Sequence, residues 1–193
     1  MKAKYLFSAV FILLSFIYCI SACNNAPKGK GDSLATREDT VARGKYLVTT
    51  IGCGDCHSPK VMTPQGPVPD TTRELSGHPA DMKLGKIDKG QLQEWVYFNS
   101  IFTAIVGPWG VSYAANLTSD ETGIGNWTEQ QFFTAIRKGK YKGMENNRDL
   151  LPPMPWPSYR HMNDDDLKAI FAYLKSTKPI NNVVPAPKSL NDL

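Results

Sequence analysis

Residues 53–57 read Cys53-Gly54-Asp55-Cys56-His57, a C-x-x-C-H pattern. Two cysteines three positions apart at the start of a helix can reach both vinyl groups along one edge of a porphyrin and form thioether bonds. The histidine that follows then lies beneath the ring, where an imidazole nitrogen can bind the iron. The pattern therefore predicts one covalently bound haem c, attached through Cys53 and Cys56, with His57 as the proximal iron ligand.

The cysteine pair has three other interpretations. A thioredoxin-like redox pair also uses C-x-x-C, but it follows a β-strand in an α/β pattern, whereas the residues before Cys53 favour a helix. A structural zinc site needs four ligands, and the chain has no second C-x-x-C pair. A disulfide between Cys53 and Cys56 also stays open, because two cysteines this close pair readily in an oxidising compartment. Haem attachment is favoured over all three, because the pattern continues directly into His57.

The sixth iron ligand has to come from elsewhere in the chain, and the first candidate is Met154. A His/Met ligand pair is typical of electron-transfer cytochromes, because a thioether sulfur favours ferrous iron. Met154 lies in Leu150-Leu151-Pro152-Pro153-Met154-Pro155-Trp156. Prolines on both sides predict a rigid, non-helical loop, which suits a side chain that must meet iron at a fixed distance.

Other residues remain as alternative distal ligands. Most methionines in proteins fill cores, and Met162 directly precedes Asn163, the position of a hydrophobic staple to Leu167. Met162 is therefore the reserve. His78 and His161 would give histidine ligation on both sides, but neither has the proline setting of Met154.

The first 22 residues have the composition of a targeting segment. Lys2 and Lys4 precede an apolar run over residues 5–20, which is typical of a secretory signal peptide. Residues 20–23, Ile-Ser-Ala-Cys, resemble a bacterial lipobox, so we expect cleavage before Cys23 and lipidation of that cysteine. Residues 23–36 are rich in Gly, Asn, Lys and Pro and are expected to form a flexible tether. The sequence thus predicts an exported domain, on the periplasmic or extracytoplasmic side, with a lipid anchor in a bacterial membrane.

Composition limits the remaining chain to one globular domain. The chain has 193 residues, of which 41% are hydrophobic and 21% charged, as in ordinary soluble proteins. Removal of Lys2 and Lys4 with the signal peptide lowers the formal charge from +4 to +2. This charge is too small for a nucleic-acid-binding domain, which normally carries a dense basic stripe.

Periodicity predicts helices at both ends of a domain over residues 37–180. Apolar spacing and capping patterns indicate helices over 38–50, over 129–138 with Thr128 as its cap, and from Asn163 to a stop at Pro179. Gly44 lies inside the first helix, where it would permit a close helix contact. Residues 58–80 favour loop, 91–98 a short helix, and 102–117 extended chain with a turn. The predicted fold is mainly α, with a loop-rich insertion over 58–127 that contains a small hairpin, and an extended tail over 181–193.

These residues resemble the class I cytochrome c domain. The resemblance is closer to the cytochrome c subunits of membrane-bound bacterial dehydrogenases that oxidise alcohols, aldehydes or sugar acids. Those subunits carry three haem motifs, whereas this chain has one, so it resembles a single unit with a longer middle. The matching stretches are residues 43–47 (RGKYL) before Cys53, 115–120 (ANLTSD), 122–128 (TGIGNWT), 154–156 (MPW), 164–167 (DDDL) and 172–174 (AYL).

The resemblance implies helices packed around one haem, with the first and last helices crossing at Gly44 against Phe171 or Leu174. It also implies outer-sphere transfer of single electrons, without substrate chemistry, so the chain is not expected to be an enzyme by itself. Redox partners would be a dehydrogenase or quinol-oxidising complex and a terminal oxidase or other acceptor. The alternatives are a haem enzyme or sensor with an open sixth site, and a thiol–disulfide oxidoreductase. Four aromatic residues either line the haem pocket or pack in the core: Trp109, Trp127, Trp156 and Tyr159.

Overall fold

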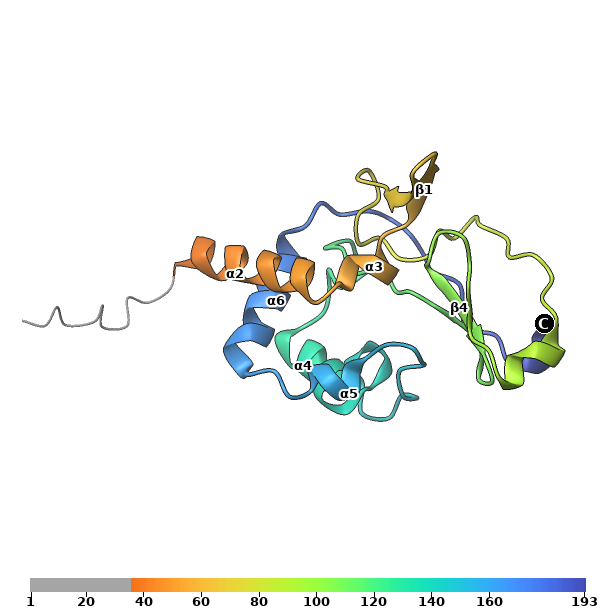
Figure 1. The fold of residues 1–193 in the computed structure, drawn as a ribbon. Coiled ribbons are helices and arrows are strands. Elements are labelled where there is room, and N and C mark those ends of the chain that lie inside the picture. Colours follow the sequence, from red (N-terminus) through yellow and green to blue (C-terminus); the bar gives the residue numbers. More distant parts are fainter. Residues whose placement is uncertain (1–35) are drawn as a thin grey trace, which may run out of the picture. The chain divides into compact units, whose positions relative to one another are not determined.

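The computed structural model of the protein describes residues 36–193 (Figure 1). The signal peptide expected over residues 1–22, the lipidation site Cys23 and residues 24–35 of the expected tether lie outside this range. The described residues form five α-helices, α2 to α6, and two small antiparallel sheets. No helix in this part of the chain is long and apolar enough to cross a bilayer.

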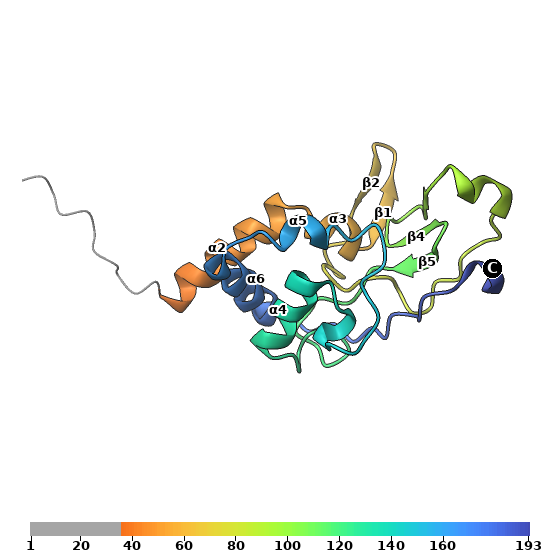
Figure 2. The same cartoon turned by 90° about the horizontal axis from the view of Figure 1, so that it is seen from below.

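Two capped helices form the main packing unit. Helix α2 (Arg37–Thr50) begins where the Thr36 hydroxyl accepts a hydrogen bond from the Asp39 backbone N–H, and helix α6 (Asp164–Ser176) begins at the Asn163 cap. The Thr36 and Asn163 side chains bind backbone donors that would otherwise lack a partner in the first turn. The two helices lie side by side in both views (Figures 1 and 2). The first and last predicted helices are therefore confirmed, although α6 ends at Ser176, before Pro179.

The close contact expected at Gly44 is confirmed, but its predicted partners are wrong. A Cβ on Gly44 would overlap the carbonyl oxygen of Ala169 and come within 2.7 Å of the Cβ of Tyr173. The expected partner Phe171 instead stacks on Phe132, with ring centroids 5.2 Å apart. Leu174 belongs to the buried core. On α6 the contact with Gly44 is therefore made by Ala169 and Tyr173, one turn apart on the helix, and Ala169 also belongs to the buried core.

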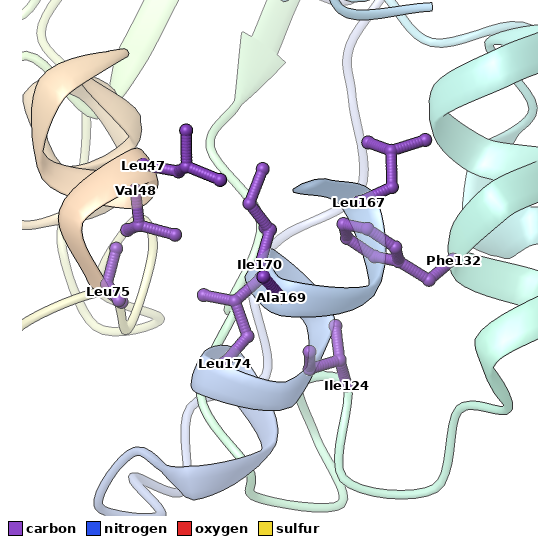
Figure 3. Close-up of a cluster of buried hydrophobic side chains, with 9 residues drawn as sticks. All are labelled: Leu47, Val48, Leu75, Ile124, Phe132, Leu167, Ala169, Ile170 and Leu174. Atoms are coloured by element: carbon purple, nitrogen blue, oxygen red, sulfur yellow. The ribbon is translucent and has the colours of Figure 1, made fainter. Parts of the chain in front are cut away.

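The main core lies where α6 meets α2 and α4 (Figure 3). Helix α4 (Glu129–Lys138) has the predicted bounds and the predicted capping box between Thr128 and Gln131. Figure 3 shows side chains from the two outer helices on opposite sides of α6. The buried cluster consists of Leu47, Val48, Leu75, Ile124, Phe132, Leu167, Ala169, Ile170 and Leu174.

The insertion contains more strand than predicted. Strands β1 (Lys60–Thr63) and β2 (Gly66–Pro69) form a hairpin in the segment expected to be loop. The prolines of β2 had argued against a strand, but a two-stranded hairpin consists only of edge strands, where proline is tolerated. A second sheet has the order β3 (Tyr97–Phe98), β4 (Ala104–Gly107), β5 (Gly110–Tyr113). The extended chain and turn expected over 102–117 are confirmed.

The helix predicted over 91–98 is wrong. Residues Lys89–Gln93 form the 3₁₀-helix η1, and the chain then extends into β3. Tyr97 and Phe98 pair with Val106 and Ile105, so tertiary pairing overrides a weak local preference.

A second apolar cluster brings the insertion and the C-terminal tail together. Its buried members are Leu92, Val106 and Val111, and Leu190 and Leu193 of the tail pack against them. Lys188 forms an antiparallel bridge with Val111, and residues Leu190–Asp192 form the 3₁₀-helix η3.

The remaining short elements of the described chain are α3 (Cys53–His57), η2 (Tyr141–Gly143) and α5 (Trp156–Tyr159).

Candidate haem site

Helix α3 consists of the five residues of the C-x-x-C-H pattern, Cys53–His57. Gly52 separates α3 from α2 and adopts a left-handed conformation with φ of 75°, which glycine occupies without strain. A Cβ on Gly52 would lie 2.5 Å from a carboxylate oxygen of Asp55. The glycine thus lets the chain turn sharply after α2 and start a new helix with Cys53.

The two thiols are free and half-buried. Burial raises the pKa of Cys53 to about 11 and also raises the pKa of Cys56. The thiol–disulfide oxidoreductases depend on a cysteine whose pKa is lowered so that it is a thiolate near neutral pH. A helix, not a strand, precedes the pair, and all strand pairs of residues 36–193 are antiparallel. The site therefore lacks both the activated thiolate and the fold context of a thioredoxin-like centre.

His57 is held with one ring nitrogen free. Its Nδ1 lies 2.7 Å from the carbonyl oxygen of Ala115, an acceptor that places the ring proton on Nδ1. Burial lowers the pKa of His57, which favours the neutral imidazole. A neutral ring that donates from one nitrogen to a backbone carbonyl and offers the other nitrogen is the arrangement that metal-ligating histidines adopt. Two unpaired thiols and this imidazole on one short helix fit the attachment of a haem.

A zinc site finds no support in the described residues. Nowhere between residues 36 and 193 do three or more histidine, cysteine or acidic side chains come together in the way that a metal cluster needs. A structural zinc ion takes four such ligands. The donor set of α3 is therefore better matched to an iron that a porphyrin already holds on four sides.

Met154 lies half-buried in the proline loop that leads into α5. The loop is tied to the end of α2, because the Tyr159 hydroxyl donates a hydrogen bond to the Ile51 carbonyl at 3.0 Å. Ile51 directly follows α2, and Cys53 begins the next helix. Tyr159 therefore joins the segment that carries Met154 to the segment that carries the cysteines.

The reserve ligands are placed differently. Met162 packs against the main core, as a core methionine does, and His161 is exposed. His78 is fully buried with its Nδ1 2.9 Å from the Thr103 hydroxyl. Its ring centroid lies 4.7 Å from that of Tyr113, and its Nε2 has no hydrogen-bond partner within the described chain.

The four aromatic residues that were expected to line the haem pocket or pack in the core have different surroundings. Trp127 packs against the main core. Trp156 covers Gly139, since a Cβ there would overlap the indole ring. Trp109 folds back over Gly107 in the β4–β5 turn, and Tyr159 makes the hydrogen bond described above. Ordinary packing thus accounts for Trp127, whereas Trp109 and Trp156 cover glycines in turns and Tyr159 binds the end of α2.

The sequence is similar to curated bacterial proteins. It is 38% identical over 152 residues to the fructose dehydrogenase cytochrome subunit of Gluconobacter japonicus, and this match covers 78% of the chain and 24% of that protein. It is 30% identical over 154 residues to the gluconate 2-dehydrogenase cytochrome c subunit of Pantoea cypripedii, covering 79% of the chain and 25% of that protein. The chain is a homologue of dehydrogenase cytochrome c subunits. The resemblance expected from residues 43–47, 115–128 and 154–174 is confirmed.

The chain corresponds to part of its relatives. It spans about a quarter of the length of these two subunits. A shorter match, 38% identical over 78 residues, covers 39% of the chain and 16% of the cytochrome c subunit of the quinone-dependent alcohol dehydrogenase of Gluconobacter oxydans. No protein-family model matches the chain. All three of these relatives are cytochrome subunits of dehydrogenases.

Proposed function

We propose that the protein is a monohaem c-type cytochrome that carries single electrons between extracytoplasmic redox partners. One observation supports this above all: two free thiols and a neutral imidazole share the five-residue helix α3, and the Nδ1 of His57 is bound to the Ala115 carbonyl at 2.7 Å. This leaves the Nε2 of His57 as the nitrogen for iron. The homologous cytochrome subunits support the same chemistry.

Each residue has a separate role in the proposal. Cys53 and Cys56 form the thioether bonds, His57 is the proximal ligand, and Met154 is the distal ligand. A bound haem supplies an iron that gains and loses one electron without making or breaking a substrate bond. The hydrogen bond from His57 to Ala115 fixes the ring tautomer and orientation, and the prolines around Met154 limit the motion of its loop. Both restraints keep the ligands in place while the charge of the site changes.

The proposed location follows from the N-terminal sequence. Residues 1–22 would serve as a lipoprotein signal peptide, Cys23 would carry the lipid, and residues 23–36 would tether the domain to a bacterial membrane. Covalent attachment suits such a protein, because an exported domain cannot recover a lost haem from the cytoplasm.

The proposed donor is a dehydrogenase, because the relatives are cytochrome subunits of fructose, gluconate and alcohol dehydrogenases. A quinol-oxidising complex is a second donor class, and a terminal oxidase is the proposed acceptor. The described C-x-x-C-H pattern at residues 53–57 would make this chain one relay step between donor and acceptor.

The test is the mass and spectrum of the full chain, expressed together with a cytochrome c maturation system. We expect the mass of one haem per chain and a low-spin, six-coordinate spectrum in both oxidation states. Cys53→Ser with Cys56→Ser should give an apo protein, whereas Met154→Ala should keep the haem and lose the sulfur-to-iron band. A colourless wild type at its apo mass contradicts the proposal. Carbon monoxide binding by ferrous wild type would favour the haem sensor or enzyme instead.

A further inference from the structure

Strand β5 and the residues after it contact both segments that carry the proposed iron ligands, helix α3 and the Met154 loop. Ser112 of β5 is 7% exposed, and its hydroxyl donates a hydrogen bond to the carbonyl oxygen of Pro152 at 2.6 Å. Pro152 lies two residues before Met154. Further along the same segment, Ala115 accepts the hydrogen bond from His57. One stretch of chain thus holds the proximal histidine at one point and the distal loop at another.

The bond to Pro152 is the stronger of the two that the Ser112 hydroxyl can donate. The alternative acceptor, the Ile105 carbonyl, lies at 3.4 Å, a distance at which a hydroxyl bond is weak. The indole N–H of Trp109 donates toward Ser112 Oγ, also at 3.4 Å. The indole N–H of Trp109 therefore lies where it can be accepted by a lone pair of the Ser112 oxygen. This arrangement leaves the hydroxyl proton of Ser112 to be donated to the Pro152 carbonyl.

The methionine loop depends on such outside anchors. Pro152, Pro153 and Pro155 have no backbone N–H, so among residues 152–155 only Met154 can donate one. The Met154 N–H bonds to the Leu151 carbonyl at 3.3 Å. Downstream of Met154, the chain is held by the start of α5 and by the bond from Tyr159 to Ile51. Upstream, the Ser112 hydroxyl ties the carbonyl of Pro152 to β5.

We propose that Ser112 is a positioning residue that keeps the Met154 loop closed and so opposes displacement of the distal ligand. The inference rests on the proposed function, with Met154 bound to iron. An added ligand such as imidazole can replace Met154 only when the loop swings away, and this movement breaks the bond from Ser112 to Pro152. The free energy of this bond therefore opposes binding of the added ligand. A typical neutral hydrogen bond should weaken imidazole binding about fivefold.

The experiment is an imidazole titration of the ferric, haem-loaded full chain, followed in every variant by the shift of the main haem absorption band and, where Met154 is present, also by loss of the sulfur-to-iron band. Ser112→Ala should bind imidazole about fivefold more tightly than wild type. Ser112→Thr keeps the hydroxyl and should restore the wild-type affinity. Ser119→Ala is the matched control, because Ser119 donates a comparable bond to the Thr177 carbonyl at 2.5 Å, at the end of α6. It should lose stability but leave imidazole affinity unchanged.

A double-mutant cycle with Met154→Ala separates the loop effect from a general one. Without Met154 no ligand has to be displaced, so adding Ser112→Ala should leave imidazole affinity unchanged. Should Ser112→Ala be too unstable to purify, Ser112→Thr and Ser112→Val have the same shape and differ only in the hydroxyl. The fivefold difference is then expected between these two.

The outcomes distinguish this inference from the function on which it rests. A wild type that contains haem but shows no sulfur-to-iron band refutes Met154 as the ligand, and the role of Ser112 with it. A wild type with the band, combined with equal imidazole affinities for Ser112→Ala and Ser119→Ala, overturns only the inference. A fivefold effect that persists in the Met154→Ala background also overturns it, because the effect would not pass through the methionine.

Discussion

The contact between α2 and α6 can be tested with Gly44→Ala. Alanine favours a helix interior over glycine by about 1 kcal/mol, so an isolated α2 would gain stability. In the folded protein the new Cβ would overlap the Ala169 carbonyl oxygen and lie within 2.7 Å of the Tyr173 Cβ. A backbone carbonyl cannot move aside by changing rotamer, so the two helices have to separate. Overpacking of this kind costs about 3 kcal/mol, and the net loss should be about 2 kcal/mol.

The assay is denaturant unfolding and thermal unfolding of the haem-loaded protein, both followed by circular dichroism. A loss of about 2 kcal/mol corresponds to a fall in melting temperature of about 4 to 8 °C for a domain of this size. Ala42→Gly, at an exposed position of α2, measures the helix-propensity contribution alone. Gly85→Ala adds a methyl where nothing lies within 4 Å and should be neutral. If Gly44→Ala proved as stable as wild type or more stable, the packing account of this glycine would be wrong.

Three further predictions concern the core, the loop and a buried histidine. Leu167→Ala truncates a side chain that is 1% exposed, and chemical unfolding should show a loss of about 2 to 5 kcal/mol. Tyr159→Phe removes the bond to Ile51 and should cost about 1 kcal/mol, whereas Tyr46→Phe, at a 58% exposed position, should cost nothing measurable. Burial lowers the folded-state pKa of His78, so the unfolded chain binds the extra proton first as pH falls. Stability should drop below about pH 6.5 by up to about 1.4 kcal/mol per pH unit, and His78→Asn should reduce this slope. An unchanged slope would show that another group causes the drop.

Local signals predicted the helices well. The capping box of Thr128 and Gln131 and the Asn163 cap are made by residues three positions apart, so the sequence displays them directly. Gly44 predicted a close approach but not its partners, because the side of α6 that meets α2 depends on how α6 also packs against α4. The β1–β2 hairpin was missed because prolines and exposed side chains hid an edge pairing that a short linear pattern does not reveal.

The candidate haem site was also predicted only in part. Cys53, Cys56 and His57 are adjacent in sequence and carry recognisable chemistry. The groups that hold His57 and the Met154 loop do not, because Ala115 contributes only a backbone carbonyl and Ser112 is one serine among many. These contacts join residues 58 and 40 positions apart, respectively. No spacing rule connects such residues before the insertion folds back on α3.

The separation between His57 and Ala115 has a consequence for biogenesis. A growing chain emerges N-terminus first, so residues 53–57 leave the ribosome 58 residues before the carbonyl that fixes the imidazole. At about 5 to 20 residues per second this delay is roughly 3 to 12 seconds. The enzymes that build thioethers could therefore meet a motif whose histidine is still free to turn, and the later segment would close over it once the cofactor is in place.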